Sequence, residues 1–136
     1  MDIQMAAICD AATEDQRGKL NILGAFDTIY ARDFPVTHPH CAVAYRIRFS
    51  RLEAGVHRIK VTFVDADGRP ILPPLEGEMN IHPAEEQDST VANLILVING
   101  LKIEKAGEHS IDMSLDGNPV KSLPLFVKKE PSESAG

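Results

Sequence analysis

Two closely spaced histidines, His38 and His40, are the first residues of this 136-residue chain that could do chemistry. Together with nearby carboxylates, two imidazoles could hold a metal ion that activates water for hydrolysis. Such sites need three or four converging ligands, and the other histidines are scattered along the chain. Because Pro39 favours an extended conformation at His38, we expect both imidazoles to be exposed loop side chains. A small metal-dependent hydrolase that uses His38, His40 and nearby carboxylates is therefore kept only as the alternative to a non-enzymatic function.

Acidic residues form two further patterns. Residues 65–68, Asp-Ala-Asp-Gly, resemble the start of a calcium loop, but Pro-Ile-Leu at 70–72 stands where oxygen ligands should follow, which favours a simple turn. Glu76 and Glu78 would lie about 7 Å apart on one face of a strand. That spacing suits paired carboxylates in glycoside hydrolysis, and it equally suits ordinary surface residues. We interpret both patterns as structural.

Nucleophiles and cofactor loops are not indicated. The chain has no Gly-x-Ser-x-Gly elbow and no glycine-rich loop with a lysine that opens a helix. Cys9 and Cys41 each lie inside an apolar stretch, so we expect free, buried thiols, with a disulfide as the alternative. His109 begins an alternating segment, where its ring could bond to a backbone carbonyl. The sequence therefore predicts no catalytic residue, no cofactor and no metal ion.

Four cations form the one cluster that could bind a partner. If the segments 41–50 and 58–63 pair as a hairpin around Gly55, these side chains share the outer face of two adjacent strands: Arg46, Arg48, Arg58 and Lys60. They are either a solvated face balanced by acidic neighbours such as Glu76 and Glu78, or a docking face for an acidic protein. We favour the solvated face, and the partner-docking face is the sharper hypothesis.

The elements that must position these residues follow from alternation of apolar and polar side chains, the pattern of a half-buried strand. The pattern is clear at 41–50, 58–63, 75–82 and 109–116, and weaker at 4–9, 19–30, 91–98 and 120–127. The segment 91–98 is apolar on both faces apart from Asn93, and its β-branched residues favour a central strand over a short buried helix. Gly24 suggests a bulge. Without helical periodicity, about 7–9 strands predict an all-β, antiparallel, two-sheet sandwich of Ig-like type.

Length and composition limit the domain organisation, the partners and the location of the protein. We expect one domain over residues 1–128 and a flexible tail at 129–136, which is almost free of apolar residues. Acidic residues outnumber basic ones 20 to 14, which disfavours nucleic acid and anionic membranes as partners. The N-terminus is acidic, and no apolar run approaches the roughly 20 residues that span a bilayer. We therefore expect a cytoplasmic protein.

Several segments resemble a family of small bacterial proteins that carry a single domain of unknown function. The resemblance rests on residues 8–12, 34–35, 38–39, 65–68, 107–109, 116–117 and 123–127, and above all on Gly-Lys-Leu-Asn-Ile-Leu-Gly-x-Phe at 18–26. It implies a stand-alone Ig-like sandwich with no catalytic residue or cofactor to carry over. His109 stands where the family tends to have an aromatic residue.

Function stays unknown at this level. A complete sandwich without embedded chemistry favours a non-enzymatic intracellular binding or scaffold module that acts through protein–protein contacts. Its partner would be an unidentified protein or a second copy of the chain, bound through an edge strand or a sheet face.

Overall fold

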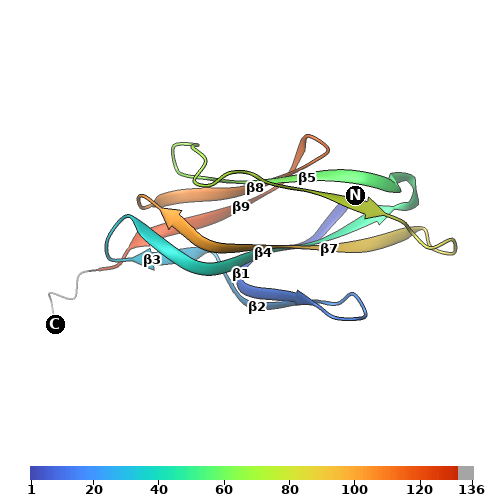
Figure 1. The fold of residues 1–136 in the computed structure, drawn as a ribbon, viewed down its shortest axis with the longest axis horizontal. Helices are drawn as coiled ribbons and strands as arrows, with labels where there is room; N and C mark the ends of the chain where they lie inside the picture. The colour runs from blue at the N-terminus through green and yellow to red at the C-terminus, as the bar shows by residue number, and fades with distance from the viewer. Residues whose placement is uncertain (132–136) are drawn as a thin grey trace.

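Nine strands and one turn of 3-10 helix make up the part of the chain that the computed structural model describes, residues 1–131 (Figure 1). The strands are β1 (Asp2–Glu14), β2 (Leu20–Phe26), β3 (Thr28–Ala31), β4 (Val36–Ser50), β5 (Gly55–Val64), β6 (Leu75–Ile81), β7 (Ser89–Ile103), β8 (Gly107–Leu115) and β9 (Asn118–Lys129), and the helical turn η1 covers Arg51–Glu53. Each segment expected to be extended contains a strand, and most of these strands are longer than expected. The segment 19–30 contains two, β2 and β3.

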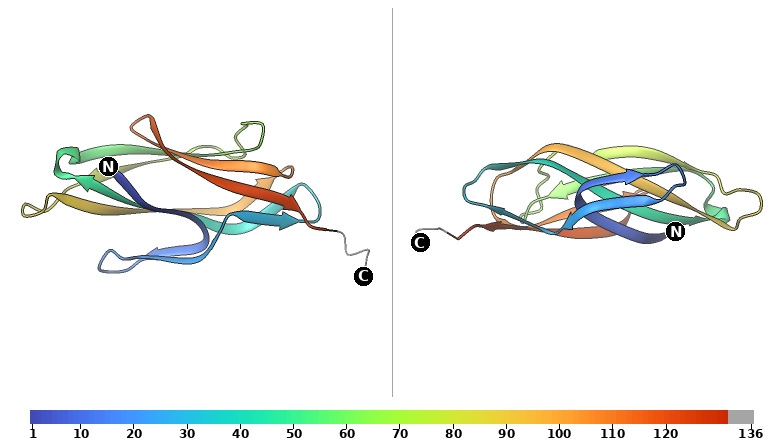
Figure 2. Two further views of the ribbon diagram at one scale, coloured as in Figure 1. Left: turned by 180° about the vertical axis from the view of Figure 1, so that it is seen from behind. Right: turned by 90° about the horizontal axis from the view of Figure 1, so that it is seen from below.

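The strands form a four-stranded sheet, β2-β1-β4-β7, and a five-stranded sheet, β3-β9-β8-β5-β6 (Figure 2). In chain order, β1, β4 and β7 take the places of immunoglobulin strands A, B and E, and β5, β8 and β9 take those of C, F and G. The predicted all-β, Ig-like sandwich is therefore confirmed. One pair departs from the antiparallel expectation, because β3 runs parallel to β9.

The main core lies between the two sheets and follows the alternation in the sequence. On β4, every second residue from Cys41 to Phe49 is almost fully buried, and β5 and β8 contribute the facing side chains. The central residues of this core are Val43, Tyr45, Ile47, Phe49, Val61, Phe63, Ile111 and Met113. Burying one such apolar side chain stabilises the fold by about 1.5–3 kcal/mol.

The expected β4–β5 hairpin is wrong. After Ser50 the chain passes through η1 and Gly55 into the opposite sheet, where β5 pairs with β6 and β8. The interpretation of 91–98 as a central strand is also wrong, because β7 lies at the edge of the four-stranded sheet. Alternation specifies which face of a strand is buried, but it carries no information about the neighbouring strand.

A third layer covers part of the four-stranded sheet. Residues 2–9 of β1 pair with β4, whereas the rest of β1 pairs only with β2, so the β1–β2 hairpin lies over the outer side of β4 (Figures 1 and 2). Beneath it a second small core holds the fully buried Cys9, Ala42 and Ala44, with Ala12, Leu20, Ile22 and Ile95 packed against them. Small residues on β4 allow this close approach.

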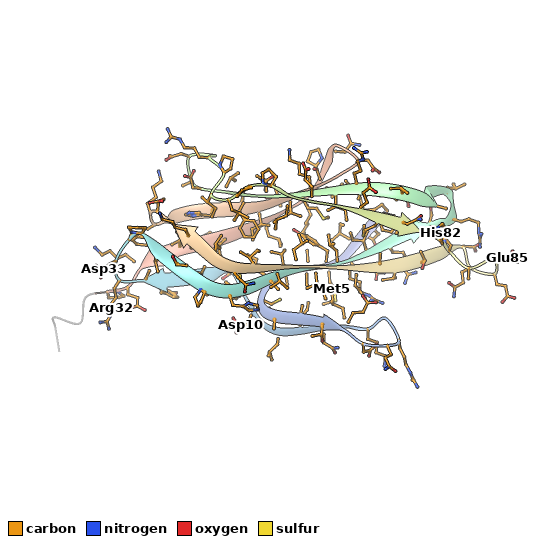
Figure 3. All side chains as sticks on the ribbon, in the orientation of Figure 1. Met5, Asp10, Arg32, Asp33, His82 and Glu85 are labelled. Carbon is orange, nitrogen blue, oxygen red and sulfur yellow. The ribbon has the colours of Figure 1, made fainter. Side chains whose placement is uncertain are left out.

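Gly24 has a different role from the expected bulge. The β1–β2 pairing keeps one register on both sides of it, from Ile8–Phe26 to Glu14–Leu20. Gly24 adopts a φ of +67°, and a Cβ there would collide with the carboxylate of Asp10, which lies on the hairpin layer (Figure 3). Glycine is needed because this carboxylate packs onto the backbone.

The C-terminal strand continues past the expected domain boundary at residue 128. β9 ends at Lys129, and the backbone N–H of Glu130 donates to the carbonyl of Ala31 at 2.8 Å. The first residues of the segment expected to be a flexible tail, 129–136, therefore belong to the sheet. Residues 132–136 lie outside the described part of the chain.

Candidate interaction surface

The four cations of the expected docking face lie on opposite sides of the sandwich. Arg46 and Arg48 project outward from β4 in the four-stranded sheet, and Arg58 and Lys60 project outward from β5 in the five-stranded sheet. The prediction that they share one face was wrong, because it depended on the β4–β5 hairpin. The two pairs therefore belong to two separate surfaces.

Arg46 links β4 to the hairpin tip and to β7 through hydrogen bonds. Its Nη1 donates to the carbonyl of Gly18 at 3.2 Å and to Oδ1 of Asn93 at 3.0 Å. The amide Nδ2 of Asn93 donates to the same Gly18 carbonyl at 2.8 Å. The tip of the β1–β2 hairpin is thereby fastened to β4 and β7. Arg48 is similarly engaged, because its Nη1 donates to Ser89 Oγ at 2.9 Å.

The cations on β5 face the acidic residues expected from the sequence. The β5–β6 register places Arg58 opposite Glu78 and Lys60 opposite Glu76. Nε of Arg58 lies 3.7 Å from Oε1 of Glu78, with side chains that are 83% and 62% exposed. Exposed pairs of this kind contribute about 0–1 kcal/mol. A shallow hollow of about 460 Å³ beside Gly77 therefore has walls of mixed charge.

The two closely spaced histidines are strand residues, contrary to the expected loop. Both lie on β4, where Nδ1 of His40 is 2.8 Å from Oδ1 of Asn99 and the ring of His38 lies 5.6 Å from that of Phe26. Within residues 1–131, no group of three or more histidine, cysteine or acidic side chains could hold a metal ion. The metal-dependent hydrolase gains no support from this geometry.

Two structural interpretations from the sequence are confirmed. His109 is 1% exposed, and its Nδ1 lies 3.1 Å from the carbonyl of Gly107. In the segment 65–68, Oδ1 of Asp65 accepts the backbone N–H groups of Asp67 and Arg69, both at 2.9 Å. That carboxylate oxygen therefore closes a turn between β5 and β6.

Cys9 and Cys41 are free and buried, as expected. Cys9 is opposite Ala42 in the β1–β4 register, so it faces the hairpin layer while Cys41 faces the main core. The two thiols lie on opposite faces of one sheet, which prevents a disulfide. Burial raises the pKa of Cys41 to about 11, which makes this thiol a poor nucleophile at neutral pH.

A histidine–aspartate pair that the sequence did not reveal joins β5 to the β8–β9 turn. Nδ1 of His57 lies 2.6 Å from Oδ2 of Asp116, and its Nε2 lies 2.5 Å from the carbonyl of Glu53. The ring stacks on Phe49 at 5.1 Å. Oδ1 of Asp116 accepts the backbone N–H of Arg58 at 2.8 Å. Both ring nitrogens thus face acceptors, which leaves neither free for acid–base catalysis.

The pKa values of this pair follow from its hydrogen bonds. The Glu53 carbonyl, and after it the carboxylate of Asp116, raise the pKa of His57. The Arg58 N–H and then the His57 ring lower the pKa of Asp116. The Asp-Gly turn was visible in the sequence, but nothing in the sequence indicated that His57 meets it.

The free edge of β7 is the least protected edge of the sandwich. β7 is 15 residues long and, in the part of the chain that the structure describes, pairs only with β4. Residues 89–101 include no charge and no proline, and Val97 is 54% exposed. By contrast, β6 carries Glu76 and Glu78, β3 has four residues, and β2 has seven with Gly24 inside. Charges, prolines and short length are the usual protections of edge strands, and the 13 residues 89–101 of β7 contain neither a charge nor a proline.

The fold and this edge define an immunoglobulin-like β-sandwich whose edge strand β7 carries no charge from residue 89 to residue 101. The chain belongs to the Family of unknown function (DUF6941), whose model matches residues 4–128. The expected membership in an uncharacterised single-domain family is thereby confirmed.

Similarity to solved structures concerns the fold alone. The chain resembles part of a structure titled β-glucosidase from Listeria innocua in complex with isofagomine, with a TM-score of 0.52 and 10% sequence identity. The match covers 91% of this chain and 16% of the enzyme's chain. Comparison with curated proteins gives no match. None of the helices in residues 1–131 has the length and apolar character to cross a membrane.

Proposed function

We propose that this protein is a non-enzymatic binding module that acts through protein–protein contacts along the free edge of β7. The observation that carries the proposal is the unpaired, uncharged edge between Ser89 and Leu101. The N–H and C=O groups of an edge strand can form a ladder with an extended segment of a partner. Apolar side chains on both faces of the strand would then select an apolar partner strand.

Partial burial along β7 supports this role. Ala92, Leu94 and Leu96 pack against the main core but stay partly exposed. No strand of residues 1–131 pairs with the edge of β7 that points away from β4. A strand added at the edge would shield these side chains from water. The gain is about 25 cal/mol for each Å² of apolar surface removed from water.

Several polar side chains are engaged in contacts within the fold. Arg46 fastens the hairpin, His40 contacts Asn99, and both nitrogens of His57 face acceptors. These groups hold strands and turns of the fold together. The edge of β7 is therefore the better candidate for contact with other molecules.

Capture of partners by tagged protein tests the proposal. Val97→Lys places a charge on the edge, and Val56→Lys is a matched control on β5, since Val97 and Val56 are 54% and 58% exposed. We expect the wild type and Val56→Lys to retain the same protein partner, counting a differently tagged second copy as a partner, and Val97→Lys to lose it. Equal capture by all three folded proteins would contradict the proposal.

A further inference from the structure

We infer that the strand that fits the β7 edge is β7 of a second copy, paired antiparallel with Ile95 on the two-fold axis. This inference rests on the proposed binding role of the edge and names its partner. A two-fold arrangement is the commonest symmetry of protein dimers, and it uses the same patch on both copies. The patch must therefore be compatible with itself.

The charge pattern of the chain fits self-pairing at β7. Like charges directly opposite each other destabilise paired strands, and residues 89–101 contain none. Each copy carries a formal charge of -6, so the net electrostatic interaction between two copies is repulsive. A long uncharged edge is where two such molecules can approach with the least repulsion. An acidic or basic partner would find no complementary charge along it.

The side chains of β7 match each other about this axis. On the face that packs against the core, Leu94 would lie opposite Leu96 of the second copy, and Ala92 opposite Ile98 of the second copy. These pairs are apolar on both sides, and in the single chain all but Ile98 are only partly buried. On the outer face, Ile95 would meet its own counterpart. The two four-stranded sheets would then form one continuous sheet, with both β7 edges paired.

Charges at the ends of this segment distinguish between two neighbouring registers. With Ile95 on the axis, Asp88 of each copy lies opposite Lys102 of the other, so opposite charges meet at both ends of the paired segment. Moving the axis by one residue to Leu96 would instead place Asp88 opposite Glu104 of the second copy. Charge complementarity therefore favours the arrangement centred on Ile95 over the one centred on Leu96.

Charge exchange with sedimentation across a concentration series tests this pairing. We expect a wild-type dimer, about tenfold weaker association for Asp88→Lys or Lys102→Glu alone, and recovery to within about threefold in the double variant. Lys60→Glu, on the opposite sheet, is the control and should leave the dimer unchanged. Circular dichroism of every variant shows whether the fold is intact.

A wild type that is monomeric at every concentration would overturn the inference. So would a dimer that resists both single charge reversals or Val97→Lys. A monomeric wild type whose heterologous partner is still lost on Val97→Lys would leave the proposed binding edge standing and refute the second copy as its occupant. The two proposals therefore fail on different results.

Discussion

The imidazole of His57 is held between the carboxylate of Asp116, 2.6 Å from Nδ1, and the backbone carbonyl of Glu53, 2.5 Å from Nε2. A carbonyl and an ionised carboxylate are both acceptors, so each ring nitrogen must carry a proton to satisfy both contacts. The contacts join η1, β5 and the β8–β9 turn at one end of the sandwich. They make the stability of the protein dependent on pH.

The first prediction concerns this pH dependence. The folded state raises the pKa of His57 above its unfolded value of about 6.5, so its stabilisation is complete below that value and is lost as the pH rises through the folded pKa. Asp116 has a lowered pKa in the fold, so its contribution is lost as the pH falls through that pKa. Urea unfolding should show a wild-type midpoint that declines from about pH 6 to about pH 9 more steeply than that of His57→Gln.

His82→Gln is the control for this prediction, because His82 is exposed and follows the last residue of β6 (Figure 3). It should keep the wild-type profile. Parallel profiles for wild type and His57→Gln would show that the pair does not titrate with folding.

The second prediction concerns the hydrogen bonds by which Arg46 links β4 to the hairpin tip. Arg46→Met removes the donor that Nη1 supplies to Gly18 and Asn93, which should lower the free energy of unfolding by about 1–3 kcal/mol. Amide hydrogen exchange should accelerate within residues 20–26 more than in β8. Arg48→Met, which loses only a bond to Ser89, should leave exchange in the hairpin unchanged. Equal exchange in the hairpin of both variants would show that Arg46 does not hold the hairpin tip in place.

The third prediction concerns thiol labelling. In the native wild type, neither Cys9 nor Cys41 should react with a thiol reagent, and both should react in denaturant, because both are buried and free. In Arg46→Met, Cys9 should be labelled before Cys41, since Cys9 lies under the hairpin and Cys41 faces the main core. Mass spectrometry of tryptic peptides measures the order. Prior labelling of Cys41, or an intact disulfide, would contradict the arrangement.

The fourth prediction concerns the hydroxyl of Tyr45. This group is buried in the main core, has no hydrogen-bond partner among the described residues, and has a pKa raised by burial and then by Asp112. Removing an unsatisfied hydroxyl while keeping the ring should change stability by less than about 1 kcal/mol, or increase it. Denaturant unfolding of Tyr45→Phe tests this, with the exposed Tyr30→Phe as control. A loss above about 2 kcal/mol would mean that the hydroxyl is bonded.

Much of the fold was predictable because its information is local. Alternation identified the strands and the inward side chains of β4, β5 and β8, since side chains of neighbouring strand residues point to opposite faces. The turn at 65–68, the free thiols and the core position of His109 followed from residue type and immediate neighbours. These features need no knowledge of which strand lies beside which.

The candidate surface was less predictable because it depends on strand neighbours. Arg46 and Arg58 were expected side by side and lie on opposite faces of the sandwich. β7 has the apolar pattern of a central strand, yet it lies at an edge, with part of its outer face beneath the hairpin. An apolar pattern on both faces of a strand indicates that both faces are buried. It does not show whether neighbouring strands or a folded-over hairpin bury them.

By itself the sequence determined the all-β class, the strand positions and the buried face of the clearest strands, because these follow from the geometry of a single extended chain. Only the tertiary structure decided the sheet to which each strand belongs, the hairpin layer over β4, the free edge of β7 and the meeting of His57 with Asp116. Those two residues are separated by 59 positions. Contacts at that separation arise from the packing of the whole chain, which no short pattern records.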